Sequence, residues 1–202
     1  MSKKWAQQLG KDALDFIDKA TTDHWWEYVI EAVPVAGDAY GAGKLGKQGY
    51  TVWKGLEKFK KVAELGERAA KVSWKKLGSN LNLKGKGSDK LIDFINDVNK
   101  NIGEKLNDNT LAGAIKEKFG LNSGFKPDGT PFKHLNSAND RLRGLDNKIK
   151  DLSEDIFKND SFDGETLDSA KKILKNLESQ RDKIKEALKS ADKAVEKMGK
   201  IE

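Results

Sequence analysis

The sequence contains no cysteine and only two histidines among its 202 residues. Without cysteine the chain can form no disulfide and no thiolate site, and a cysteine-based zinc site is excluded. The two histidines, His24 and His134, lie far apart in the sequence, which argues against a multi-histidine metal site within one chain. We therefore expect neither a metal ion nor another cofactor.

Long apolar runs are absent as well. No segment approaches the ~20 consecutive apolar residues that a membrane-spanning helix needs, so no stable membrane span is expected. The charges of Met1-Ser-Lys-Lys are not followed by the apolar stretch of a signal peptide, and we expect none. No segment has a convincing β-strand pattern. The expected fold class is all-α.

Charged residues, in contrast, are abundant. They make up 35% of the chain, and 38 basic residues exceed 32 acidic ones, which gives a net charge of +6. This balance favours an anionic partner, which could be a nucleic acid, an anionic membrane or an acidic protein. Because mixed signs are typical of helices with solvated faces, charge alone does not identify the partner.

The N-terminal half has apolar residues at helical spacing over residues 5–20, 24–30 and 44–77. His24 lies beside two tryptophans, and we interpret it as a partly buried structural residue. The glycine- and alanine-rich segment 35–46 matches neither phosphate-loop motif. The basic amphipathic pattern of 44–77 fits a helix on an anionic membrane, and it fits equally well a solvated face over a packed one.

The glycine-rich segment 78–88 is a composition break that predicts a linker, with a domain boundary near residue 86. We expect a helical delivery segment over residues 1–85 and a second helical domain over 86–202. Ser88-Asp89 is the expected cap of the first helix of this domain. A short helix over 110–119 should follow, closed by Gly120.

The end of the chain predicts two long helices. Apolar residues recur at alternating spacings of three and four over 135–156 and again over 167–198, as in helices that pair antiparallel across a short turn. Ser137-Ala-Asn-Asp140 resembles a capping box for the first of them. Arg181 interrupts the second stripe, and a charge there must snorkel, find a carboxylate or face a groove.

The segment 124–134 holds two of the three prolines of the chain, each close to a glycine. Proline fixes φ and glycine permits positive φ, so Pro127-Asp128-Gly129 predicts a tight turn. The resulting loop should be stiff. It presents Phe132 and His134 at its end, between basic residues.

These residues are the candidates for RNA-cleaving chemistry. Such cleavage needs a base for the ribose 2′-OH, an acid for the leaving 5′-oxygen, and cations around the phosphate. His134 can be the acid or the base, Asp128 can orient it or act as its partner, and Phe132 can stack a base. The candidate cations are Lys126, Lys133, Arg141 and Arg143. The other interpretation is that His134 only packs on Phe132 where the helix begins.

The string Lys126-Pro-Asp-Gly-Thr-Pro-Phe-Lys-His134, followed by Ala138, Gly144-Leu145 and Ile149, resembles the polymorphic toxin type 28 domain. This domain is a C-terminal toxin module of bacterial contact-dependent and secreted effectors. The resemblance covers roughly residues 89–200, and Val33-Pro-Val-Ala-Gly-Asp38 is similar to the linkers that precede such toxins. It implies a helical ribonuclease that cleaves tRNA without a metal ion. It also implies a delivery machinery, action in the cytoplasm of a target cell, and a cognate immunity protein.

In that family an aromatic residue stands two positions before the histidine and a glutamate three positions after it. The resemblance carries these roles to Phe132 and His134, whereas Ser137 stands in place of the glutamate and Lys133 where an acidic residue is common. Asp140, one turn further on, can replace the missing carboxylate. The family also has an upstream aspartate, for which the candidates are Asp108 and Asp128.

A second class of function stays open, a membrane-active or protein-binding helical effector without catalysis. The tryptophan-rich stretch 24–30, the small residues of 35–46 and the basic helix over 44–77 favour it.

Overall fold

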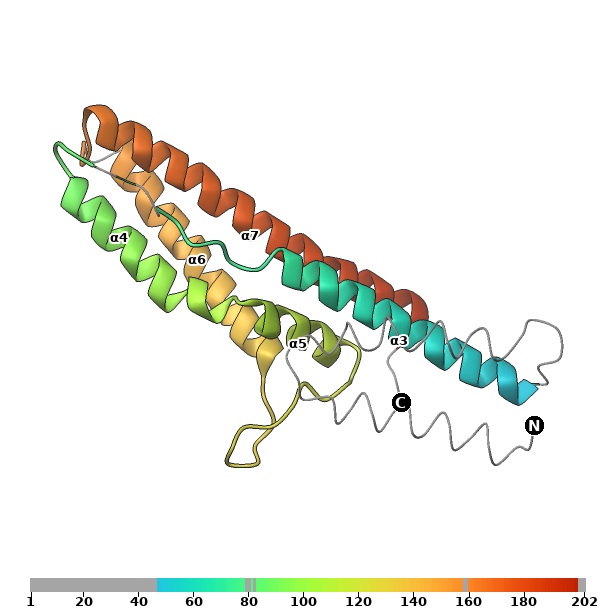
Figure 1. Ribbon diagram of the computed structural model, residues 1–202. Helices are drawn as coiled ribbons and strands as arrows, with labels where there is room; N and C mark the ends of the chain where they lie inside the picture. Colours follow the sequence, from blue (N-terminus) through green and yellow to red (C-terminus); the bar gives the residue numbers. More distant parts are fainter. Residues whose placement is uncertain (1–46, 79–80, 82, 158–159, 200–202) are drawn as a thin grey trace.

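The computed structural model describes residues 47–78, 81, 83–157 and 160–199. The described chain is all-α, as expected. Its elements are α3 (Lys47–Lys71), α4 (Ser88–Asn101), a short 3-10 helix η1 (Gly103–Lys105), α5 (Asp108–Lys118), α6 (His134–Phe157) and α7 (Gly164–Met198). They form an elongated bundle in which α7 runs along α3 and α6 (Figure 1). The predicted segments before residue 47, including His24, lie outside the described residues.

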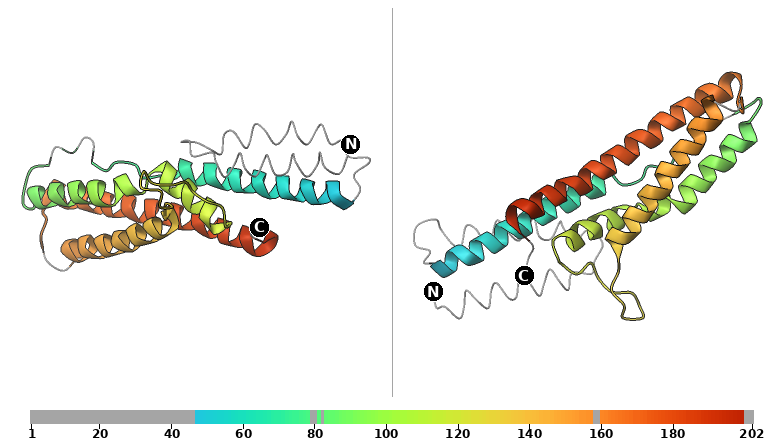
Figure 2. Two further views of the ribbon diagram at one scale, coloured as in Figure 1. Left: turned by 90° about the horizontal axis from the view of Figure 1, so that it is seen from below. Right: turned by 180° about the vertical axis from the view of Figure 1, so that it is seen from behind.

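The helix α5 occupies the centre of this bundle. Seven successive residues, Thr110–Lys116, are all buried, so α5 has no solvated face along this stretch. It contacts α3, α6 and α7, and the views in Figure 2 show the same arrangement. Small residues at Ala112, Gly113 and Ala114 allow these close approaches.

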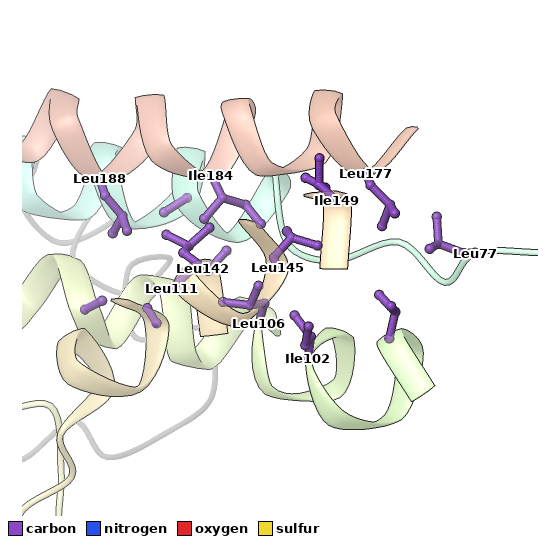
Figure 3. Close-up of a cluster of buried hydrophobic side chains, with 14 of the residues drawn as sticks. Leu77, Ile102, Leu106, Leu111, Leu142, Leu145, Ile149, Leu177, Ile184 and Leu188 are labelled. Carbon is purple, nitrogen blue, oxygen red and sulfur yellow. The ribbon is translucent and has the colours of Figure 1, made fainter. Parts of the chain in front are cut away.

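One hydrophobic core joins the helices. Figure 3 shows Leu111 of α5 close to Leu142 of α6 and to Ile184 and Leu188 of α7. Phe59 of α3 belongs to the same buried cluster. Within the described part of the chain, buried residues from both sides of the boundary expected near residue 86 belong to this cluster.

The predicted periodicity of α6 matches its buried face, which consists of Ala138, Leu142, Leu145, Ile149, Leu152 and Ile156. Between α6 and α7, Asp146 accepts hydrogen bonds from Lys185 Nζ at 2.8 and 3.0 Å. Asp146 also lies 3.6 Å from Arg181 Nη1. Arg181 was expected to snorkel, find a carboxylate or face a groove, and the structure shows that it finds carboxylates. Besides Asp146, its guanidinium pairs with Asp182.

The helix ends differ from the prediction in several places. α4 begins at Ser88 itself after Gly87, whose φ is 82°, and the Ser88 hydroxyl donates to the carbonyl of Gly85 instead of capping the helix.

The ends of the other helices were predicted with mixed success. α6 begins at His134, so the predicted capping box starting at Ser137 is wrong. α3 ends at Lys71 rather than at residue 77. The cap at Gly120 is confirmed, with φ of 81° after α5.

Residues 72–77 leave α3 and dock on α4 through the buried side chain of Asn99. Its Oδ1 accepts hydrogen bonds from Trp74 Nε1 at 3.1 Å and from the backbone N–H of Leu77 at 2.9 Å. Its Nδ2 donates to the carbonyl of Leu77 at 3.0 Å. One amide side chain therefore satisfies the indole N–H of Trp74 and both backbone groups of Leu77.

Asn99→Ala is expected to lower the free energy of unfolding by at least about 3 kcal/mol. The substitution leaves the indole N–H of Trp74 and two backbone groups of Leu77 without a partner, and each such group costs ~1–3 kcal/mol. Urea denaturation measures the change. Asn101→Ala, at the exposed end of the same helix, is the matched control and should change stability by less than ~0.5 kcal/mol. Equal losses in the two variants would contradict the docking role of Asn99.

Candidate functional site

Residues 124–133, here named the finger, project from the bundle between α5 and α6 (Figure 1). The backbone N–H of Gly129 donates to the carbonyl of Lys126 at 2.9 Å, which closes a turn with Pro127 at its second position. The predicted tight turn is thus confirmed. Further bonds join Lys126 to Thr130 and Phe132 to Gly124, so the two arms of the finger are held together.

Asp128 lies at the exposed tip of the finger. Its carboxylate accepts hydrogen bonds from the backbone N–H of Thr130 at 2.9 Å and from the Thr130 hydroxyl at 2.6 Å. These bonds hold the pKa of Asp128 below its ordinary value. No contact joins Asp128 to His134 among the described residues, and the local geometry gives Asp128 a role in the turn.

His134 is the first residue of α6, and its half-buried ring lies between Phe132 and α5. The rings of Phe132 and His134 are stacked, with centroids 4.9 Å apart and planes inclined by 20°. On the other side, a Cβ atom at Gly113 would lie 2.4 Å from His134 Cδ2. Only glycine at position 113 leaves room for the imidazole in this place.

This setting favours the neutral form of His134. Burial lowers the pKa of the imidazole, the carboxylate of Glu117 raises it, and the ammonium of Lys116 lowers it, with a net value below 6.5. Since the unfolded chain binds the proton more tightly, the stabilisation from His134 is complete above about pH 6.5. It is lost as the pH falls through the lower pKa of the folded state.

Glu117 of α5 is the residue that the sequence reasoning missed. Its Oε1 accepts from the backbone N–H of His134 at 2.7 Å, and its Oε2 accepts from that of Leu135 at 2.8 Å. The hydroxyl of Ser123 also donates to Oε1. A carboxylate from another helix therefore caps α6, where the helix dipole favours negative charge. One sign of this external cap is in the sequence. Lys133 directly precedes the helix, and its side chain has no oxygen that could accept a hydrogen bond from the first backbone N–H groups.

The other carboxylates considered from the sequence have different partners. Asp140 pairs with Arg143, and Asp108, the first residue of α5, accepts a hydrogen bond from the backbone N–H of Asn109. The carboxylate that acts on the imidazole of His134 is instead that of Glu117. Ser137, which stands in place of the family glutamate, lies in the first turn of α6 and donates its backbone N–H to the carbonyl of Lys133.

The two candidate arginines lie on opposite sides of α6. Arg141 is seven residues after His134, which places it on the same face about 10 Å along the axis. Because helical side chains lean towards the N-terminus, we expect the Arg141 side chain to lean towards His134. Its Nε is buried and has no hydrogen-bond partner in the part of the chain that the structure describes.

Arg143 follows two residues later and is therefore rotated by about 200° around the helix. It pairs with Asp140 and lines a groove of about 300 Å³ between α6 and α7, together with Lys185 and Lys189. The remaining candidate cations, Lys126 and Lys133, are exposed on the finger. The structure thus brings Phe132, His134 and Arg141 to one side of α6 and leaves Arg143 on the other.

Comparison with protein-family models, with curated proteins and with solved structures gives no match for this chain. The likeness to the toxin family remains a prediction from the sequence. Within the described ranges, no group of three or more potential metal ligands comes together. None of the helices in those ranges combines the length and hydropathy of a membrane span. Segments 24–30 and 35–46, which favour the membrane-active alternative, lie outside them.

Glu117→Gln is expected to lower the pKa of His134 further, because it removes the charge that raises this pKa and keeps an oxygen acceptor for the helix. An NMR titration of the imidazole measures the effect. The unmodified protein should titrate below 6.5, and the variant lower still. Asp128→Asn, at the tip of the finger, is the control and should leave the titration unchanged. A rise in the pKa of His134 on Glu117→Gln would contradict the assignment.

Proposed function

We propose that the protein is a ribonuclease in which His134 acts by general acid–base chemistry that needs no metal ion. The observation that carries the proposal is the imidazole itself. It is neutral near pH 7, held between Phe132 and α5, and located at the base of an exposed finger. A base that is unprotonated at the working pH and fixed in place suits proton abstraction.

The proposed reaction is transfer within the RNA backbone. The imidazole of His134 takes the proton of a ribose 2′-OH, and the oxygen attacks the adjacent phosphorus. The 5′-oxygen leaves with a proton from solvent, which gives a 2′,3′-cyclic phosphate and a 5′-OH end. Arg141, on the same face of α6, stabilises the negative charge that develops on the phosphate. Phe132 stacks a base next to the cleaved bond.

The biological setting of the proposal rests on the resemblance of residues 126–134 to the type 28 toxin domain. In this setting the protein is a delivered antibacterial effector that cleaves tRNA in the cytoplasm of a target cell. The cell that produces it would make a cognate immunity protein. Net charge of +6 supports binding to the phosphate backbone, and such binding should weaken with added salt.

Purified protein incubated with total tRNA in EDTA is expected to give discrete fragments with cyclic phosphate ends. His134→Ala should slow cleavage by at least ~100-fold, because general base catalysis contributes ~10²–10⁴ in rate. Gel analysis of end-labelled tRNA measures both. Equal cleavage by the two proteins, or intact tRNA at high enzyme excess, would count against the proposal.

A second experiment separates the two arginines. Arg141→Ala is expected to slow cleavage by about 100-fold, the typical cost of losing one group that stabilises the transition-state charge. Arg143→Ala removes the same charge from the opposite side of the same helix, and it should change the rate by no more than about threefold, since exposed paired cations contribute little. Similar losses in both variants would mean that the arginines act only through net charge.

A further inference from the structure

The finger carries an exposed aromatic ring that the proposed chemistry does not use. Among the residues whose side-chain exposure the structure describes, four large hydrophobic ones are exposed: Ile92, Phe125, Phe132 and Phe157. Two of the four lie on the finger, where Phe125 is 54% exposed and Phe132 is 37% exposed. Apolar side chains clustered on one short projecting segment, unlike a single exposed ring, indicate an interaction surface.

The backbone pairing of the finger fixes where these rings lie. Phe125 and Pro131 form an antiparallel bridge, and cross-strand partners share one face of a pair of strands. Phe132 follows Pro131 directly, and successive side chains of an extended strand point to opposite faces. Phe125 and Pro131 therefore form one apolar face of the finger. Phe132, stacked on His134, belongs to the other face.

Charge on the finger favours an anionic occupant. By the same alternation, Lys126 lies on the face of Phe132 and Lys133 lies on the face of Phe125, so each face of the finger has one ring and one cation. Asp128 is the one acidic residue between them, and its carboxylate is engaged by Thr130. An aromatic face next to a cation matches a nucleobase next to its phosphate, the pattern of proteins that bind single strands.

We propose that the finger selects unpaired RNA and that Phe125 is its second base-stacking residue. In a duplex the base faces are already stacked on one another, and the deep groove of A-form RNA is closed to side chains. An exposed ring can therefore engage only bases that lie outside a helix. The inference builds on the proposed ribonuclease activity, for which it defines the substrate as loops and single-stranded segments.

Binding is measured with a fluorescent oligonucleotide of 2′-O-methyl RNA, which lacks the 2′-OH needed for cleavage. The full chain should bind the single strand, and bind the same sequence in duplex form at least tenfold more weakly. Phe125→Ala is expected to weaken single-strand binding by about 5- to 150-fold, the range for loss of one stacked base. Phe125→Tyr should retain binding. Phe125→Leu should lose it, because leucine keeps the apolar bulk and removes the ring.

Phe157→Ala is the matched control, because Phe157 is 70% exposed at the far end of α6. It should bind as the unmodified protein does. Equal affinity for single strand and duplex, or an unchanged affinity of Phe125→Ala, would overturn the inference, and so would Phe125-dependent self-association without RNA binding. Because the probe cannot be cleaved, binding and catalysis are tested separately. Phe125-dependent binding by a protein that leaves tRNA intact would support the RNA-binding role of the finger and contradict the proposed catalysis.

Discussion

The carboxylate of Glu117 is the group on which the geometry around His134 depends. It accepts hydrogen bonds from Ser123, just before the finger, and from His134 and Leu135, just after it. One side chain therefore closes the loop at both ends and starts α6. Glu117 belongs to α5, which is buried among three other helices. The position of His134 is therefore fixed relative to the buried centre of the bundle. Hydrogen bonds to charged groups contribute ~1.5–3 kcal/mol each, which makes this anchor stronger than a local cap.

This anchor also explains why a nearby carboxylate does not make His134 basic. A negative charge ordinarily raises the pKa of an imidazole. Here the oxygens of Glu117 are engaged by backbone N–H groups and by the positive end of the helix dipole, which offset part of the charge. Burial of the ring against Gly113 and the ammonium of Lys116 then have the larger effect, and the pKa of His134 falls. The residue that holds the imidazole in place leaves it neutral.

Features that depend on local spacing, such as helix faces and the turn, could be predicted from the sequence. Features that depend on contacts between distant residues, such as the start of α6, could not. The periodicity over 135–156 and 167–198 matches α6 and α7, because helical spacing alone decides which residues share a face. The turn at Pro127 was predictable for the same local reason. The caps expected at Ser88 and Ser137 were wrong, because Gly87 and Glu117 start those helices. Glu117 lies 17 residues before its nearest partner in α6, and the need for glycine at 113 depends on a ring from another helix.

The distribution of charge explains why one side of α6 suits a phosphate better than the other. In the groove between α6 and α7, three of the four lining cations already pair with carboxylates. Lys185 pairs with Asp146, Lys118 with Asp192, and Arg143 with the neighbouring Asp140. A phosphate entering this groove must displace carboxylates or lie beside them, and like charges oppose its binding. On the other side, Arg141 lies on the helix face that it shares with His134, and no ion pair joins its guanidinium to a carboxylate within the described residues. An anion there competes with no carboxylate for this cation. The net charge of the chain thus says less about where RNA binds than the pairing of individual cations does.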